Sequence, residues 1–293
     1  MERGWLASRS SLGTLEPRNY GREVTELGVS AEDFIAGAGF RWHQRFELAP
    51  GIWTPGTSDV ERFLRLARLP ADLSGMRILD VGTSNGGTAF ACERRGAEVV
   101  AADIVPPDYS GFARIRDFLG SSCAYVESTV YELPERVDGR FDVVLFLGVL
   151  YHLRHPLLAL DALRRLDADA VVLETEVADR ALGRRLRWRA LASFHRGGLH
   201  GDATNWFVPT VAALEEWCAS SGFVVEEVVR WPPGPLMTRL AILADRRREG
   251  PRWWAAAQRA PAIRALLRLR RGEGQAEFEA SSWAEGPFRV EPL

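Results

Sequence analysis

Residues 76–88, with the sequence MRILDVGTSNGGT, constrain the fold of this chain more than any other stretch. Residues 77–81 are short, apolar and rich in β-branched side chains, which predicts a strand covered on both faces of a sheet. Gly82 and Gly86 then allow a sharp turn and let a ligand approach the backbone, because they have no Cβ. A predicted helix over residues 87–95 offers its N-terminal N–H groups to that ligand. The stretch therefore predicts a nucleotide-binding strand–turn–helix unit.

The next predicted strand, residues 97–102, ends at Asp103. This acid lies about 20 residues beyond the turn, where doubly wound nucleotide-binding folds place the acid that holds a ribose. The turn itself, residues 82–87, reads GTSNGG and lacks the second glycine of the dinucleotide fingerprint G-x-G-x-x-G. It also lacks the Lys-Ser/Thr pair of a P-loop. Both a hydride-transfer site and a P-loop are therefore disfavoured.

The remaining sequence alternates between predicted strands and helices. The expected helices cover residues 59–69, 112–119, 156–166 and 210–221, and the expected strands cover residues 124–126, 141–147, 170–173, 223–229 and 237–244. On the helix that begins at Pro156, we expect Leu157, Leu160 and Leu163 to share one buried face. This alternation predicts an α/β fold, Rossmann-like and doubly wound, with a mostly parallel seven-stranded sheet.

Three parts are expected along the chain: an N-terminal cap or lid with a helix (residues 1–75), the sheet domain (76–245) and an arginine-rich helical tail (246–293). Residues 40–56 are rich in aromatic side chains, and they fit a mobile lid and a cap fixed to the core equally well. Residues 263–271, IRALLRLRR, are expected to form an amphipathic helix. We prefer a solvated helix there over a contact with nucleic acid or a membrane.

Composition narrows the function classes. The chain has 293 residues, is 46% hydrophobic and 26% charged, and carries a formal net charge of −2, as a globular protein without a uniformly basic surface would. It has neither an apolar run that could span a bilayer nor a signal peptide, so a cytoplasmic location without a membrane partner is expected. The three cysteines, Cys92, Cys123 and Cys218, are too widely spaced for a disulfide framework or a metal pair. They are expected to be buried, and no metal site is predicted.

All 37 basic residues are arginine, and the chain contains no lysine. Schiff-base chemistry by lysine, and any site that needs an ammonium group, are therefore excluded.

Ligands of such sheets bind beyond the carboxyl ends of the strands. The candidate positions after successive strands are residues 82–86, Asp103 with Ile104, Thr129 with Val130, residues 147–152 and Glu174. Polar or glycine-containing turns after five strands are a stronger signal than the first turn alone.

Four motifs carry a resemblance to a known family. They are the DVGTSNG turn, LGVLYHLRHP at residues 147–156, Leu173-Glu174-Thr175, and NWFVPT at residues 205–210. Together they resemble the class I S-adenosyl-L-methionine (SAM) dependent methyltransferases. Within that class they resemble the bacterial tRNA wobble-uridine carboxymethyltransferase family and its uncharacterised methyltransferase relatives, over about residues 46–245.

The resemblance implies SAM as the cofactor and assigns residues to it. The aminoacyl moiety would be held at the turn, by Asp80, Gly82, Thr83, Ser84, Asn85 and Gly86. The ribose would be held by Asp103, followed by Ile104, and the adenine would be flanked by Thr129 and Val130, while Leu147 and Tyr151 would face the sulfonium. Trp53 matches a tryptophan of the acceptor-side wall, and Arg239 matches an active-site arginine.

One departure from the family pattern matters. The tRNA enzymes use carboxy-SAM, and lysines before the first strand help to hold its extra carboxylate. This chain has no lysine, and arginine is not an equivalent donor. We therefore expect unmodified SAM and plain methyl transfer. A tRNA acceptor is disfavoured as well, because the chain lacks a broad basic face.

Methyl transfer needs the acceptor lone pair in line with the S–CH₃ bond. If the acceptor is a hydroxyl, a base must take its proton. His152 and His43 are the candidate bases, followed by Glu174, and Tyr151 is expected to line the methyl path. His152 also fits a purely structural role in capping or packing.

The expected function is transfer of a methyl group from SAM to an oxygen or nitrogen of a small molecule, for instance in secondary metabolism. The first alternative is a tRNA wobble-uridine modifying enzyme, which transfers a carboxymethyl or methyl group. The second is a non-catalytic SAM-binding module. The sequence leaves the acceptor and the oligomeric state open.

Overall fold

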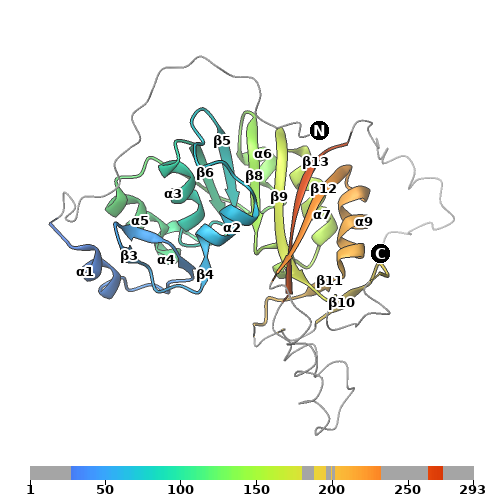
Figure 1. Ribbon diagram of the computed structural model, residues 1–293, viewed down its shortest axis with the longest axis horizontal. Coiled ribbons are helices and arrows are strands. Elements are labelled where there is room, and N and C mark those ends of the chain that lie inside the picture. Colours follow the sequence, from blue (N-terminus) through green and yellow to red (C-terminus); the bar gives the residue numbers. More distant parts are fainter. Residues whose placement is uncertain (1–27, 180–187, 196–198, 200–201, 232–262, 273–293) are drawn as a thin grey trace, which may run out of the picture.

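A seven-stranded sheet organises the computed structural model, which describes residues 28–179, 188–195, 199, 202–231 and 263–272 (Figure 1). The strand order is β12-β13-β9-β8-β5-β6-β7. The strands are β5 (Arg77–Val81), β6 (Glu98–Asp103), β7 (Ala124–Glu127), β8 (Phe141–Leu147), β9 (Ala168–Val177), β12 (Phe223–Trp231) and β13 (Ile263–Arg271). Strands β5 to β9 pair in parallel, and β13 runs antiparallel to both of its neighbours. The prediction of a mostly parallel Rossmann-like sheet is confirmed.

The helices lie on both faces of this sheet. They are α1 (Ala31–Ala36), α2 (Val60–Leu66), α3 (Gly87–Arg94), α4 (Pro107–Ser110), α5 (Phe112–Leu119), α6 (Leu133–Arg136), η1 (Leu150–His152), α7 (Pro156–Arg165) and α9 (Val211–Ser220). Short strands form three further pairs: β1 (Gln44–Arg45) with β4 (Ser58–Asp59), β2 (Glu47–Ala49) with β3 (Ile52–Trp53), and β10 (Ala192–Phe194) with β11 (Phe207–Pro209). No helix in the described part of the chain has the length and apolar character that a bilayer crossing requires.

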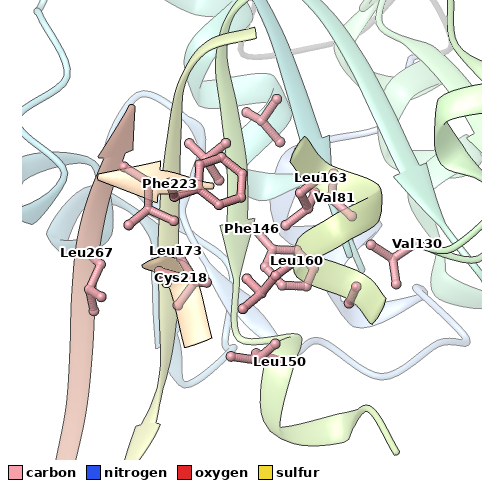
Figure 2. Packing of buried hydrophobic residues seen from close by; sticks show 14 of the residues in the cluster. Val81, Val130, Phe146, Leu150, Leu160, Leu163, Leu173, Cys218, Phe223 and Leu267 are labelled. Atoms are coloured by element: carbon pink, nitrogen blue, oxygen red, sulfur yellow. The ribbon is translucent and has the colours of Figure 1, made fainter. Parts of the chain in front are cut away.

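Side chains that alternate along the strands build two hydrophobic clusters, one on each face. In β5, Leu79 joins the cluster packed by α7 and α9, and Ile78 joins the cluster packed by α2, α3 and α5. Figure 2 shows part of the first cluster, in which Phe146 of β8 lies close to Leu160 and Leu163 of α7. Burial on both faces explains why these strands are continuous apolar runs.

Residues 263–271 correct the sequence analysis, because they form β13 and not a helix. The strand lies between β9 and β12, and Ala265, Leu266, Leu267 and Leu269 are all buried. Leucine and arginine favour a helix locally, but burial on both faces of the sheet outweighs that propensity. The sheet thus extends beyond residue 245, its predicted end. The other expected closing strand, residues 237–244, lies outside the described residues.

Two smaller predictions also fail. Leu157 is exposed, and the buried face of α7 is formed by Ala159, Leu160 and Leu163. Strand β9 continues to Val177, so Glu174 lies within the strand and not at its end. The cysteines behave as predicted, since all three are buried.

The aromatic N-terminal segment is docked on the core. Phe46 is fully buried, and Phe40 and Trp42 pack against the α2–α3–α5 cluster. Neighbouring rings connect Trp42 through Phe46 to Phe90 of α3, with centroid separations of 6.3 and 6.5 Å. This packing favours a fixed cap over a mobile lid.

Candidate cofactor and acceptor site

The turn between β5 and α3 requires glycine for packing reasons. Gly82 has φ +77°, and a Cβ on it would lie 2.2 Å from Cγ2 of Val149. Gly86 has φ +85°, and a Cβ there would lie within 2.6 Å of both Phe90 and Phe112. Only glycine avoids both the backbone strain and these overlaps. The two glycines therefore shape the turn by their contacts with protein atoms, a reason that the sequence alone did not supply.

Asp103, at the end of β6, presents an oriented carboxylate beside this turn. Its Oδ2 accepts a hydrogen bond from the N–H of Ser84 (2.9 Å), and its Oδ1 accepts one from the N–H of Val105 (3.0 Å). Ser84 has φ +53°, a left-handed conformation that is uncommon for residues other than glycine. Each oxygen keeps a further lone pair, as recognition of two adjacent hydroxyl groups requires. The neighbouring Ile104 is 66% exposed, an apolar surface beside the carboxylate.

Asp80, in β5, is buried and bonded to the turn that follows it. Its carboxylate is buried and accepts hydrogen bonds from Oγ1 of Thr83 (2.7 Å) and from the N–H of Ala89. Burial raises the pKa of Asp80 to about 7, and the nearby charge of Asp103 also acts to raise this pKa. Asp80 and the fully buried Thr83 therefore hold the turn against α3.

Asn85 connects the turn to the cap. Its Oδ1 accepts hydrogen bonds from the N–H groups of His43 (2.6 Å) and Gln44 (3.2 Å). Its Nδ2 donates to the carbonyls of Arg41 (3.1 Å) and Ser110 (2.7 Å). The buried amide thus makes all four of the bonds it can form. The sequence analysis assigned Asn85 to the aminoacyl moiety, but in the structure its side chain binds the protein's own backbone.

The N-terminus of α3 is also occupied by protein groups. The N–H of Gly87 donates to Oε1 of Gln44 (2.8 Å), and the N–H of Ala89 is bonded to Asp80. We expected these N–H groups to bind the ligand, and for these two the expectation is wrong. Phosphate binding at a helix N-terminus depends on such free groups. The site therefore suits a nucleoside without a phosphate better than a dinucleotide.

The loop after β7 lies beside Asp103. The N–H of Ser128 donates to the carbonyl of Asp103 (2.9 Å), and Thr129 bonds through Oγ1 to Glu132 (3.2 Å). Val130 is buried in the core cluster. The structure thus brings the predicted adenine-side residues next to the predicted ribose acid.

On the other side of the turn, η1 presents Tyr151 and His152, whose ring centroids are 4.3 Å apart. Nδ1 of His152 lies 2.8 Å from Oγ1 of Thr204, and that hydroxyl donates to Oδ1 of Asp202 (2.6 Å). The single hydroxyl proton is thereby committed to Asp202, so Nδ1 of His152 is the donor in its bond to Thr204. In a neutral ring, Nε2 is then the nitrogen that carries no hydrogen.

Asp202 is well suited to anchor this chain of hydrogen bonds. Bonds from the hydroxyl and the N–H of Thr204 hold its pKa below the usual value, and the nearby His152 and Arg41 act electrostatically in the same direction. Asp202 therefore remains ionised at neutral pH. The sequence analysis missed Asp202 and Thr204, because their only signal was a short polar run before the NWFVPT motif.

The other predicted site residues are more scattered. His43 is exposed beside the turn, and Trp53 lies on the β2–β3 hairpin with its ring 4.4 Å from the Arg45 guanidinium carbon. Leu147 ends β8 and pairs with Glu174, which is 0% exposed. This burial argues against Glu174 as a base for an external acceptor. Arg239 lies outside the described residues.

Residues 42–228 match a family model described as a methyltransferase domain. The chain belongs to this family. The predictions of a methyltransferase and of its Rossmann-like fold are thereby confirmed.

Similar curated proteins are named tRNA U34 carboxymethyltransferase. The protein from Azotobacter vinelandii is 36% identical over 165 residues, which cover 52% of this chain and 47% of the relative. The protein from Dichelobacter nodosus is 31% identical over 171 residues, which cover 56% of this chain and 51% of the relative. The chain thus spans about half the length of the curated relatives it matches.

Solved structures support the fold. The [4+2]-cyclase SpnF has a TM-score of 0.55 at 19% identity, covering 82% of this chain and 91% of that one. The N-terminal domain of EvdMO1 with S-adenosylhomocysteine (SAH) bound has a TM-score of 0.51 at 17% identity, covering 84% and 98%. At these identities the likeness concerns the fold alone.

The buried carboxyl of Asp80 predicts a pH-dependent stability. Its pKa is raised to about 7 from 3.8, so its stabilising effect is complete below about pH 4 and is lost as the pH rises through 7. Relative to Asp80→Asn, the wild-type free energy of unfolding should fall by roughly 2–4 kcal/mol between pH 4 and pH 8. Urea unfolding of both proteins measures this difference, and parallel pH profiles would contradict it.

Proposed function

We propose that the chain binds SAM and transfers its methyl group to a uridine of tRNA. The proposal of SAM as methyl donor is supported by Asp103. Its oriented carboxylate lies beside a helix N-terminus whose N–H groups are already bonded to protein groups. That combination fits a ribose without a phosphate. The acceptor half is supported by the curated relatives named tRNA U34 carboxymethyltransferase.

The residues present suit SAM. When bound, SAM supplies an electrophilic methyl group on a sulfonium. The carboxylate of Asp103 would accept hydrogen bonds from the ribose hydroxyls, and the exposed side chain of Ile104 would pack against the adenine near Thr129. The backbone carbonyls of Gly82 and Ser84 would bind the ammonium of the aminoacyl part, because the N–H groups of both residues are bonded within the protein.

Unmodified SAM remains the proposed donor. The chain has no lysine to bind the extra carboxylate of carboxy-SAM. Arginine offers a planar fork of donors in place of a compact ammonium group, so the two do not bind a carboxylate in the same way.

For the acceptor, the comparisons favour the alternative that the sequence analysis ranked second. We expected a small molecule, because the chain lacks a broad basic face. The curated relatives are tRNA-modifying enzymes by name, so tRNA becomes the first acceptor to test. Small-molecule methylation is the second candidate, and it is favoured by the docked aromatic cap, which is hydrogen-bonded to the turn through Asn85.

The proposed chemistry needs one proton transfer. Nε2 of His152 would take the proton of the acceptor atom, while Thr204 and Asp202 hold the ring in the required tautomer. Tyr151, next to His152 on η1, would line the path of the methyl group. Correct orientation of donor and acceptor would supply much of the remaining rate.

Asp103→Ala should weaken SAM binding about ten- to a hundredfold, because hydrogen bonds to a charged group contribute about 1.5–3 kcal/mol each. Calorimetric titration with SAM and with carboxy-SAM measures this loss, and we expect no preference for carboxy-SAM. Asp108→Ala, which removes an exposed charge on nearby α4, is the matched control. If Asp103→Ala binds SAM as tightly as the wild type does, the proposed SAM site is wrong. A strong preference for carboxy-SAM would contradict unmodified SAM as the methyl donor.

His152→Gln should lower the rate of methyl transfer from labelled SAM to tRNA at least about a hundredfold and abolish the lower inflection of the pH–rate profile. Thr204→Val should lower kcat with little change in KM, and His155→Gln, an exposed histidine at the start of α7, should change neither. Labelling of small acceptors but not of tRNA would establish the second candidate. SAM binding without transfer to any acceptor would indicate a non-catalytic module.

A further inference from the structure

An aromatic and cationic stack lies next to the proposed acceptor site. The rings of Phe194 and Trp206 are stacked, with centroids 6.2 Å apart and planes at 27°. The guanidinium carbon of Arg154 lies 4.8 Å from the centroid of the Trp206 ring. Trp206 thus contacts one flat group from each of two other parts of the chain, and these three side chains make up the stack.

The stack is held by backbone hydrogen bonds to the turn that carries the proposed base. The N–H of Trp206 donates to the carbonyl of Tyr151, and the N–H of His195 donates to the carbonyl of Trp206, both at 2.8 Å. Phe194 is also fixed, because it pairs with Phe207 in the β10–β11 hairpin, which lies below α9 in Figure 1. The position of the stack relative to His152 is therefore set by β-structure and backbone hydrogen bonds.

The outer member of the stack is not part of the core. Phe194 is 50% exposed, although Trp206 and Phe207 pack beside it. Trp188 and Leu191, just before the same hairpin strand, are exposed large side chains as well. Large apolar side chains that are exposed close together in the chain, and not singly, favour a surface that binds a partner.

Arginine next to aromatic rings indicates the chemistry of that partner. Nucleobases stack on aromatic side chains and on guanidinium planes, and their phosphates attract arginine. Arg154 is exposed, and so is Arg189, shortly before strand β10. The surface around the stack therefore carries positive charge beside the apolar rings. A purely apolar protein partner would gain nothing from these cations.

We propose that the stack of Arg154, Trp206 and Phe194 is a platform for the unpaired nucleobase next to the base that is modified. The exposed ring of Phe194 would extend the stack with that base, and Arg154 would attract the adjoining phosphate. This inference rests on the proposed tRNA acceptor and adds to it a recognition element outside the reacting centre. Such a platform would select a base in an unstacked loop over one in a duplex.

The test is a double-mutant cycle between the protein and the RNA. The RNA is an anticodon stem-loop that contains U34. It is used intact and in two variants, each of which has an abasic nucleotide at one of the two neighbours of U34. Phe194→Ala should weaken binding of the intact stem-loop about five- to a hundred-and-fiftyfold, the range given by loss of one base–aromatic stack. Removing the base at the stacking position should weaken binding to the wild-type protein similarly, and it should have no further effect on Phe194→Ala. Leu158→Ala, an equally exposed apolar side chain on α7, is the control.

The outcomes separate the platform from the proposed function. If the stem-loop binds and is methylated, but Phe194→Ala and the abasic substitutions act independently, the platform is wrong and the tRNA acceptor stands. If the wild-type protein neither binds nor methylates the RNA at low salt, the proposed acceptor fails. If Phe194→Ala instead lowers kcat/KM for a small aromatic acceptor, the stack belongs to a small-molecule pocket and the RNA platform is overturned.

Discussion

The buried amide of Asn85 is the interaction on which the rest of the site depends. It bonds simultaneously to the cap at residues 41–44 and to the carbonyl of Ser110, while Gln44 of the same cap bonds to the first turn of α3. Each of these groups would cost about 1–3 kcal/mol if it were left buried without a partner. Cap, turn and helix therefore assemble together. The absent Cβ of Gly87 completes the arrangement, because a Cβ there would lie 2.5 Å from the ring of Phe46.

This assembly also decides which ligand the turn can bind. Because Gln44 and Asp80 occupy N–H groups at the start of α3, the helix no longer offers them to a phosphate. The carboxylate of Asp103, oriented by the N–H of Ser84, is the polar side chain beside the turn that is positioned for a ligand. A fold shared with dinucleotide-binding proteins is thus fitted to a nucleoside by internal hydrogen bonds, and membership of the methyltransferase-domain family is in keeping with that chemistry.

The sequence predicted the parts that depend on local patterns. Apolar strands alternating with helices gave the sheet, and the spacing from the turn identified Asp103. It failed where distant contacts decide the outcome. Residues 263–271 look helical but become a strand because β9 and β12 bury them on both faces. The amide of Asn85 lies in the ligand motif, yet it bonds to a cap about 40 residues away. The link between Asp202 and His152 was likewise invisible, because it joins loops that meet only in the folded chain.

We expect Asn85 to build the cofactor site by holding the cap, and not to bind the cofactor itself. The most direct measurement combines amide hydrogen exchange of residues 41–46 with SAM titration of Asn85→Ala, below its unfolding temperature. Thr57→Ala, an exposed position in the same segment, is the control. We predict faster exchange of the cap amides together with at least about a tenfold loss of SAM affinity, since a freed cap also releases the α3 N-terminus. Loss of affinity with unchanged exchange would contradict this account, because it would mean that Asn85 acts directly on the ligand.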